Sequence, residues 1–378
     1  MTKHWPTPSL AKPTVAQPRS IVFLGTAHDS GGSSILASNL TTTMRADGHH
    51  VEEWYLFSSA AEMPPGARVF AHSGRSRSPL TLAMLFARVV MALRQRRPDA
   101  VIGLQPLSNL WAGLCGFIAG IRNRVATLHG PADRFNPLLM KLDAVAGRFG
   151  LYTTIIACGQ SVADTFANNG KAYARRLAVI VNGHKKPALI KRDAARRQLG
   201  LPESGAVLGQ IGRLSYQKHQ DFSLDLMRDL PDASLLLVGG GPDEAAIHRQ
   251  IAEAGILRRV QILPAIAHDH IGAFYSAVDI VLFPSRYEGL SLAAIESIHA
   301  GIPLICSDIP SFRELFHASP FLAANLLMPL DDRKAWLSRI AAILSDEKLR
   351  RKISDELRRL SPAYNFDTMA TKYLALLK

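Results

Sequence analysis

Short apolar runs alternate with helix-forming stretches along almost the whole chain. Each run is four or five residues long, and the segment that follows it is long enough for a helix. This alternation predicts β-α units and therefore parallel sheets, and it argues against a β-sandwich or a helical bundle. The predicted strands are residues 21–25, 100–104, 124–128, 154–157, 177–181, 207–211, 234–238, 260–263, 280–283 and 303–306.

The length of the chain points to more than one domain. With 378 residues, of which 48% are hydrophobic, the chain exceeds the size that one core usually serves. We therefore expect an α/β protein with two doubly wound domains, over residues 21–190 and 191–361. Residues 1–20 carry three cationic side chains and four prolines without an apolar run, so we expect a disordered tail there and not a secretion signal.

The pair Glu288 and Glu296 is the most informative feature for function. The segment that carries them, residues 284–296, follows the predicted strand 280–283 and enters a helix that stops at Gly301. In open α/β sheets such a loop lies at the carboxyl edge, where ligands bind. Eight helical residues span about 12 Å, enough for one carboxylate to bind a sugar and the other a ribose. A glutamate pair with this spacing is also common as ordinary solvated helix charge.

The turn between the two glutamates has the features of an anion site. It contains Gly289 and leads into the first helical turn, where the N–H groups of Leu290, Ser291 and Leu292 have no partner within the helix. Together with the helix dipole, these groups favour a diphosphate.

Two basic residues follow the predicted strand 207–211. Arg213 and Lys218 would lie at the same sheet edge as the Glu288 turn. Arginine offers a planar fork for phosphate oxygens and lysine a mobile point charge, so the pair suits a leaving diphosphate. Solvated loop charges give the same pattern, and the two residues alone leave both interpretations open.

Two features in the first half of the chain also lie at the ends of predicted strands. Gly31 and Gly32 follow the first predicted strand and open a helix, although without the GxGxxG fingerprint of dinucleotide sites. His129 ends the predicted strand 124–128. A glycine pair is commonly only a tight turn, and a histidine at a strand end is as often a satisfied core residue.

Together these segments resemble glycosyltransferase family 4, the large retaining family with the GT-B fold. The resemblance is strongest over residues 263–314 and extends over nearly all of the chain after the first twenty residues. Its motifs are Thr127-Leu128-His129-Gly130, Val181-Asn182-Gly183, Gly212-Arg213-Leu214 with Lys218, the turn Gly239-Gly240-Gly241, Pro264-Ala265, Pro284-Ser285, Glu288 to Glu296, and Gly301-Ile302-Pro303. Ser291 and His219 depart from the family pattern, in which glycine is frequent at these two positions.

The resemblance implies an architecture and a reaction. Two Rossmann-like domains face each other across a cleft, with the acceptor on the side of 21–190, the donor in 191–361, and a last helix at 362–378 that crosses back to the first domain. The implied enzyme is a metal-independent hexosyltransferase without a cofactor, which transfers a sugar with retention. Its donor is a nucleotide diphosphate sugar, with UDP as the expected nucleotide and GDP or ADP as alternatives.

The resemblance also assigns residues to this site. The implied catalytic residues are His129, Arg213, Lys218 and Glu288. The implied donor-binding residues are Gly31, Gly32, Arg213, Lys218, Ala265, Ile266, Glu288, Gly289, Leu290, Ser291, Leu292 and Glu296. We expect no metal ligands.

Positive charge is concentrated in the first half of the chain. Residues 1–190 hold 21 Lys and Arg against nine Asp and Glu, whereas residues 191–378 hold 23 against 22. This asymmetry favours an anionic partner, namely a phospholipid surface or a lipid-diphosphate acceptor, unless the charge is simply solvated. From this asymmetry together with the resemblance, we expect a lipid-linked or oligosaccharide acceptor. Nucleic acid is not expected, since no nucleic-acid-binding motif accompanies the arginines.

The segment 79–97 allows two interpretations. It is a basic amphipathic helix that could lie in a membrane interface, or a core helix that covers the sheet. We favour the core helix, because a parallel sheet needs cover on both faces. No apolar run reaches membrane-spanning length and three cysteines lie far apart, so we expect a cytoplasmic protein that is soluble or peripheral on the inner face of the membrane.

Three functions are consistent with these observations. The first is glycosyl transfer in the assembly of bacterial cell-surface polysaccharide, lipopolysaccharide or glycolipid. The second is a nucleotide-sugar 2-epimerase with a related fold and no acceptor. The third is a scaffold that keeps the donor pocket without catalysis.

Overall fold

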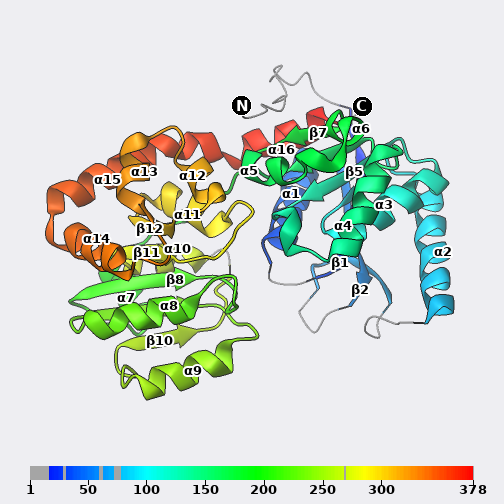
Figure 1. Ribbon diagram of the computed structural model, residues 1–378. Helices are drawn as coiled ribbons and strands as arrows, with labels where there is room; N and C mark the ends of the chain where they lie inside the picture. The colour runs from blue at the N-terminus through cyan, green and yellow to red at the C-terminus, as the bar shows by residue number, and fades with distance from the viewer. Residues whose placement is uncertain (1–16, 29–30, 59–62, 72–77, 268–269, 378) are drawn as a thin grey trace. The chain divides into compact units, whose positions relative to one another are not determined.

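The computed structural model describes residues 17–28, 31–58, 63–71, 78–267 and 270–377 (Figure 1). It divides into two compact units: the first unit takes the described residues up to Asn182 and resumes at Asp367, and the second unit runs from Gly183 to Phe366. The predicted boundaries after residues 190 and 361 therefore fall a few residues inside the second unit. Most of the predicted tail, residues 1–20, lies outside the described residues.

The first unit is built on a sheet of seven parallel strands in the order β3-β2-β1-β4-β5-β6-β7. The direction of winding reverses between β1 and β4, which makes this pair the switch point where doubly wound folds bind ligands. The strands are β1 (Ser20–Ala27), β2 (His50–Phe57), β3 (Arg68–Ala71), β4 (Ala100–Gly103), β5 (Asn123–Leu128), β6 (Thr154–Ala157) and β7 (Leu177–Val179).

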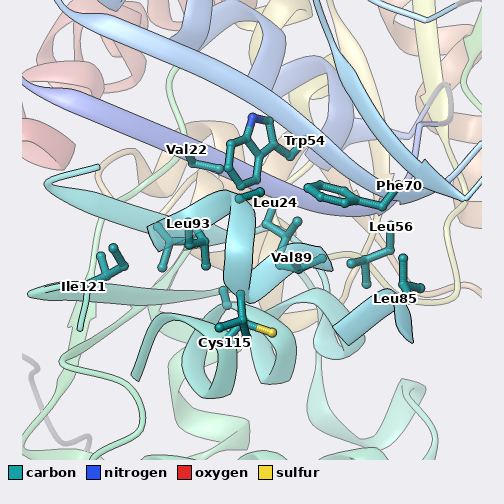
Figure 2. Packing of buried hydrophobic residues seen from close by; sticks show 14 of the residues in the cluster. Val22, Leu24, Trp54, Leu56, Phe70, Leu85, Val89, Leu93, Cys115 and Ile121 are labelled. Atoms are coloured by element: carbon teal, nitrogen blue, oxygen red, sulfur yellow. The ribbon is translucent and has the colours of Figure 1, made fainter. Parts of the chain in front are cut away.

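Helices cover this sheet and complete its core. Leu85, Val89 and Leu93 of α2 pack against Leu24 and Trp54 of the sheet, as Figure 2 shows. One side of the helix in segment 79–97 thus packs in the core, as predicted. The helices of the unit are α1 (Gly32–Ala46), α2 (Pro79–Arg96), α3 (Pro106–Ala119), α4 (Pro137–Arg148), α5 (Gln160–Thr165), α6 (Lys171–Ala174) and most of α16 (Phe366–Ala375).

The second unit has six parallel strands in the order β10-β9-β8-β11-β12-β13, and its switch point lies between β8 and β11. The strands are β8 (Ala206–Ile211), β9 (Ala233–Val238), β10 (Val260–Leu263), β11 (Ile280–Phe283), β12 (Leu304–Ser307) and β13 (Leu327–Met328). The helices are α7 (Arg192–Gln198), α8 (Gln220–Leu226), α9 (Glu244–Glu253), α10 (Ile271–Ala277), α11 (Leu292–Ala300), α12 (Pro310–Leu315), α13 (Pro320–Leu326), α14 (Arg333–Ser345) and α15 (Glu347–Leu360).

The second unit begins and ends at one place. His184 pairs with Asn365 in an isolated parallel bridge, and the His184 N–H donates to the Tyr364 carbonyl at 3.0 Å. A Cβ on Gly183 would lie 2.4 Å from the Asn365 carbonyl oxygen, so this approach requires glycine.

All ten predicted strands are present, with ends shifted by no more than two residues. Three strands were missed: β2, β3 and β13. In β2, Glu52 and Glu53 interrupt the apolar pattern. Glu53 is nevertheless buried, because its carboxylate accepts hydrogen bonds from Tyr55 Oη at 2.8 Å and Ser38 Oγ at 3.0 Å. Within the described residues, no helix has both the length and the apolar character to cross a bilayer.

Candidate functional site

The switch point of the second unit brings two loops together. One loop follows β8 and carries Arg213 and Lys218, and the other follows β11 and carries Glu288. These loops are 70 residues apart in sequence, yet the backbone N–H of Arg286 donates to the Gln217 carbonyl at 2.9 Å. The predicted convergence at this sheet edge is therefore present.

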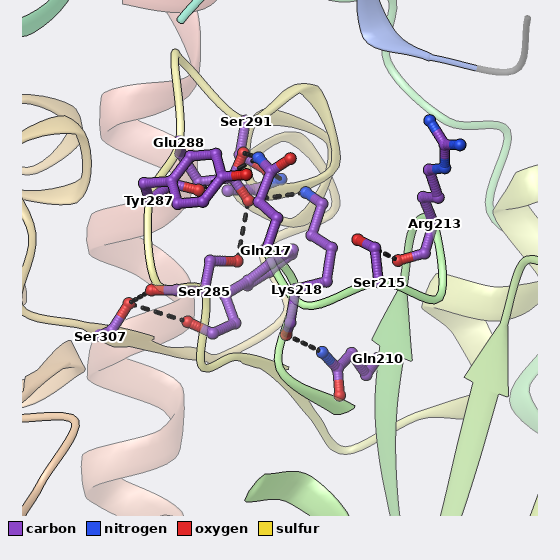
Figure 3. A network of polar contacts seen from close by, with 12 residues as sticks. Gln210, Arg213, Ser215, Gln217, Lys218, Ser285, Tyr287, Glu288, Ser291 and Ser307 are labelled. Atoms are coloured by element: carbon purple, nitrogen blue, oxygen red, sulfur yellow. Dashed lines mark hydrogen bonds and ion pairs between the residues drawn. The ribbon is translucent and has the colours of Figure 1, made fainter. Parts of the chain in front are cut away.

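An ion pair lies at the centre of the two loops. Lys218 Nζ is 2.6 Å from Glu288 Oε1, and the Glu288 residue is only 7% exposed (Figure 3). The same carboxylate accepts hydrogen bonds from Ser285 Oγ at 2.8 Å and from Gln217 Nε2 at 3.2 Å. Three donors thus hold one buried carboxylate, which compensates for its loss of water.

Neighbouring polar groups fix the two loops. Gln210 Nε2 donates to the Lys218 carbonyl at 2.7 Å, and Ser223 Oγ in turn donates to Gln210 Oε1 at 2.7 Å. On the other loop, Ser307 Oγ donates to the Ser285 carbonyl at 2.5 Å. The ion pair therefore lies on a backbone held from β8, α8 and β12.

Arg213 lies on the same loop as Lys218 but points elsewhere. Its side chain is exposed and extends away from the Lys218–Glu288 pair (Figure 3). The backbone here depends on the glycine turn after β9, because a Cβ on Gly239 would lie 2.2 Å from the Gly212 carbonyl oxygen. The close packing of the loop after β8 against the turn after β9 thus places Arg213 at the carboxyl edge, where its side chain does not contact the Lys218–Glu288 ion pair.

The start of α11 has the geometry of an anion site. Ser291 is the N-cap, and its hydroxyl accepts from the Ala294 N–H at 3.4 Å. Gly289 and Leu290 are buried in the turn before it, and Leu292 is the first helical residue. No acidic residue lies in the first turn, so the positive end of the helix dipole is not neutralised there.

Glu296 occupies a separate buried position on α11. Tyr275 Oη donates to Glu296 Oε2 at 2.7 Å, and His184 Nδ1 lies 3.4 Å from Glu296 Oε1. Burial lowers the pKa of His184, which favours its neutral form beside the carboxylate. Glu288 and Glu296 therefore have different partners, and each is 7% exposed.

The predicted donor-binding residues Ala265 and Ile266 lie in the loop after an edge strand. Ala265 and Ile266 follow β10; Ala265 is exposed and Ile266 is half-buried. The Gly239 N–H donates to the Leu263 carbonyl at 2.9 Å and so ties the end of β9 to the end of β10.

In the first unit, Gly31 and Gly32 follow β1 at the switch point. Gly31 is the N-cap of α1 and has ordinary extended backbone, with its carbonyl accepting from the Ser34 N–H at 3.1 Å. Gly32 is the first helical residue. A fifteen-residue helix therefore begins at the carboxyl edge of this sheet, again without an acidic residue in its first turn.

His129 follows β5 and has a defined protonation state. Thr127 Oγ1 donates to the Gly103 carbonyl at 2.6 Å, so at its 2.9 Å contact with His129 Nε2 it must accept. The ring therefore carries its proton on Nε2 and leaves Nδ1 as an acceptor. Burial lowers the pKa of His129 to about 4, so the ring is neutral at pH 7.

Several site residues were not predicted from the sequence. Gln217 and Ser285 hold Glu288, while Tyr275 and His184 lie against Glu296. Gln217 stands directly before Lys218, and Ser285 belongs to the motif Pro284-Ser285, so a place in or beside a motif was the available signal. His184 likewise stands directly after the motif Val181-Asn182-Gly183. No pattern in the sequence indicated that Tyr275 and His184, which come from distant segments, lie against Glu296.

Two family profiles match nearly the whole chain. The profile described as "Glycosyl transferases group 1" matches residues 191–360, and the one described as "Glycosyltransferase Family 4" matches residues 30–184. Each profile covers most of one sheet and its helices.

Individual relatives agree with these profiles. The 2-deoxystreptamine glucosyltransferase of Streptomyces kanamyceticus is 28% identical over 267 residues, which cover 62% of this chain and 68% of that protein. The lipopolysaccharide core biosynthesis mannosyltransferase LpsB of Rhizobium meliloti is 29% identical over 164 residues, 41% of this chain and 46% of that protein.

Solved structures share the fold. The crystal structure of Anabaena Alr3699/HepE in complex with UDP and glucose has a TM-score of 0.82 and 21% identity, over 95% of this chain and 99% of that chain. The predicted GT-B fold of two Rossmann-like domains is confirmed.

Proposed function

Because the chain belongs to the glycosyltransferases of group 1 and family 4, we propose that it transfers a hexose from a nucleotide diphosphate sugar to an acceptor hydroxyl, with retention of configuration. The observation that carries the proposal is the joining of Lys218 and Glu288 at the switch point of the second unit, beside the N-terminal end of α11, whose first turn holds no acidic residue. Phosphate and sugar hydroxyls are the groups that such a set of charges binds.

The donor would bind along the carboxyl edge of the second sheet. Arg213 and Lys218 would contact the diphosphate, and the turn from Gly289 to Leu292 would present N–H groups to it. Glu288 would accept hydroxyl hydrogen bonds from the sugar, and Glu296 from the ribose. UDP is the nucleotide that we propose first, and the binding of UDP and glucose by the structural neighbour HepE supports this choice.

The chemistry would rest on electrostatic stabilisation. As the bond from the sugar to the diphosphate breaks, negative charge grows on the leaving oxygen, and Arg213, Lys218 and the α11 dipole would stabilise it. The acceptor hydroxyl would attack from the same face and pass its proton to that oxygen. We propose no covalent nucleophile and no metal ion.

His129 would act as a hydrogen-bond acceptor. Its neutral ring carries the proton on Nε2 and leaves Nδ1 free to accept from a hydroxyl of the transferred sugar. With a pKa of about 4, the ring is neutral at pH 7, and its one N–H, at Nε2, is already donated to Thr127 Oγ1. It would therefore position the sugar, together with the helix that starts at Gly32.

The acceptor that we propose is lipid-linked or an oligosaccharide, at the inner face of the cell membrane. The lipopolysaccharide mannosyltransferase among the relatives and the basic first half support this choice. The protein would then work as a cytoplasmic, peripheral enzyme in cell-surface polysaccharide or glycolipid assembly.

The test is incubation of the full chain with UDP-, GDP- and ADP-sugars, followed by NMR of the products. Slow release of nucleoside diphosphate with formation of the α-sugar from an α-donor is the expected result. A changed sugar nucleotide without nucleotide release would instead indicate an epimerase. If no donor is consumed in the presence of an acceptor extract, the catalytic proposal is wrong and a scaffold role remains.

A further inference from the structure

Three helices form the outer layer on one face of the first sheet. α2, α3 and α4 are the crossover helices that lead to β4, β5 and β6 in turn, and α3 packs against both α2 and α4. Right-handed crossovers in one winding direction place such helices on the same face, and Figure 1 shows them together. We call their solvent-facing surface the outer helical face.

The outer helical face exposes an unusual amount of apolar surface. On α2 the exposed residues Leu80, Met84 and Met91 follow helical spacing on the side opposite the core. On α4 Leu138, Leu142 and Val145 do the same, together with its C-cap Phe149, which is 82% exposed. Of the sixteen large hydrophobic side chains that are exposed in the described part of the chain, eleven lie here: Leu80, Leu82, Met84, Met91, Leu114, Phe117, Ile118, Leu138, Leu142, Val145 and Phe149.

The charge on this face has a single sign. α2 and α3 contain no Asp or Glu. The single carboxylate of α4, Asp143, is fully buried and accepts hydrogen bonds from Tyr152 Oη at 3.0 Å and Tyr173 Oη at 2.7 Å. The exposed charged residues on the three helices and at their caps are all cationic: Arg88, Arg94, Arg96, Arg97, Lys141 and Arg148. Of these, Arg96 is paired with Glu52 of β2 at 2.5 Å.

Two arginines tie the C-terminal ends of the three helices together. Arg94 Nη2 of α2 donates to the Ile118 carbonyl of α3 at 3.1 Å. The Arg124 guanidinium lies 5.6 Å from the centre of the Phe117 ring, and its Nη2 donates to the Gly150 carbonyl, just after Phe149, at 3.2 Å. Phe117, Ile118 and Phe149 are therefore held near one another.

We propose that the outer helical face docks on the surface of an anionic phospholipid bilayer. Exposed apolar side chains at helical spacing can enter the lipid interface, while the surrounding arginines and lysines meet phosphate headgroups. The charge argues against a second copy of the chain, because two such faces would bring like charges together. This inference names a partner for the first unit and does not depend on the sugar-transfer reaction.

The test is co-sedimentation of the full chain with vesicles of phosphatidylcholine alone or with phosphatidylglycerol. We expect binding to the anionic vesicles that weakens as salt rises. The double variant Phe117→Ser/Phe149→Ser and the variant Lys141→Glu should each lower the partition coefficient by about tenfold. Leu257→Ser is the matched control, since Leu257 is 69% exposed on the second unit, and it should bind like the unchanged chain.

Three outcomes would overturn the proposal. The first is absence of binding to anionic vesicles, and the second is equal binding by the Phe117→Ser/Phe149→Ser variant and its control. The third is self-association of the unchanged chain that this double variant abolishes, which would assign the face to a second copy. Calorimetry with UDP monitors the donor site separately, so failure of docking and failure of the proposed function can be told apart.

Discussion

Lys218 and Glu288 form a 2.6 Å ion pair that joins the loop after β8 to the loop after β11. Both residues belong to the proposed donor site, so a diphosphate would have to compete with Glu288 for the lysine. The pair thereby links donor binding to the arrangement of both loops.

The ion pair gives a prediction on stability. Lys218→Met leaves the buried Glu288 carboxylate with only neutral donors, so the free energy of unfolding should fall by about 3 kcal/mol. The double variant Lys218→Met/Glu288→Gln removes the uncompensated charge and should recover most of the loss, yet remain inactive. Urea denaturation and activity assays check this. Equal stability of the single and double variants would contradict it.

Arg213 provides a test of nucleotide binding. Because its side chain is exposed, Arg213→Ala should leave the melting temperature nearly unchanged. If the guanidinium binds the diphosphate, affinity for UDP measured by calorimetry should fall at least about tenfold. Arg258→Ala, an exposed arginine before the start of β10, is the matched control. Unchanged affinity in Arg213→Ala would remove this residue from the site.

Glu296 provides a test of ribose recognition. Glu296→Gln keeps an oxygen that can accept from Tyr275 Oη, so the fold should be preserved. This substitution should lower the affinity of the protein for UDP. It should lower the affinity for the 2′-deoxy and 3′-deoxy analogues of UDP by a smaller average factor. Tyr275→Phe, which leaves Glu296 without its 2.7 Å donor, should show the same trend more weakly. Equal losses for all ligands would disprove the assigned role.

His129 gives a prediction for pH dependence. Its folded pKa of about 4 lies below the value of about 6.5 expected in an unfolded chain, so the unfolded state binds the proton more tightly. Stability should therefore fall as the pH drops from about 6.5 to 4, by up to about 3 kcal/mol from this residue. His129→Gln should lose that part of the dependence. An NMR titration of the ring with a midpoint near 6.5 would contradict the burial argument.

Backbone strain beside Lys218 gives a prediction with a matched control. His219 and Arg97 both adopt left-handed backbone, with φ of 56° and 48°. Replacing Arg97 by Gly should raise the free energy of unfolding by about 1 kcal/mol. His219→Gly should raise it less, because the ring also contacts Phe222. Only His219→Gly, which frees the loop next to Lys218, should change UDP affinity; an equal effect of both on binding would argue against this.

Part of this structure could be read from the sequence because it depends on local pattern. The buried parallel strands are continuous apolar runs, and two motifs that follow neighbouring strands must meet at one edge. The same rule predicts that Lys218 and Glu288 lie at one edge of the second sheet, and they form an ion pair there. His219 has a positive φ, the backbone geometry that favours the glycine implied by the resemblance at that position.

The rest depends on contacts between distant segments. Glu53 can be buried in β2 because Tyr55 and Ser38 donate hydrogen bonds to its carboxylate. Its charge interrupts the apolar pattern, so this strand could not be recognised from the sequence. The position of Glu296 against Tyr275 and His184 could not be predicted either, because a buried carboxylate needs partners that no spacing in the sequence announces.

The bridge between His184 and Asn365 gives the second unit the geometry of a domain that is inserted into the first unit. Its entry and exit lie side by side, so the chain leaves the first unit and returns to it through neighbouring points. Segments with adjacent ends are those that tolerate transplantation into another protein. An exchange of the stretch from Gly183 to Phe366 between relatives would thus replace the whole six-stranded sheet at two adjacent joints.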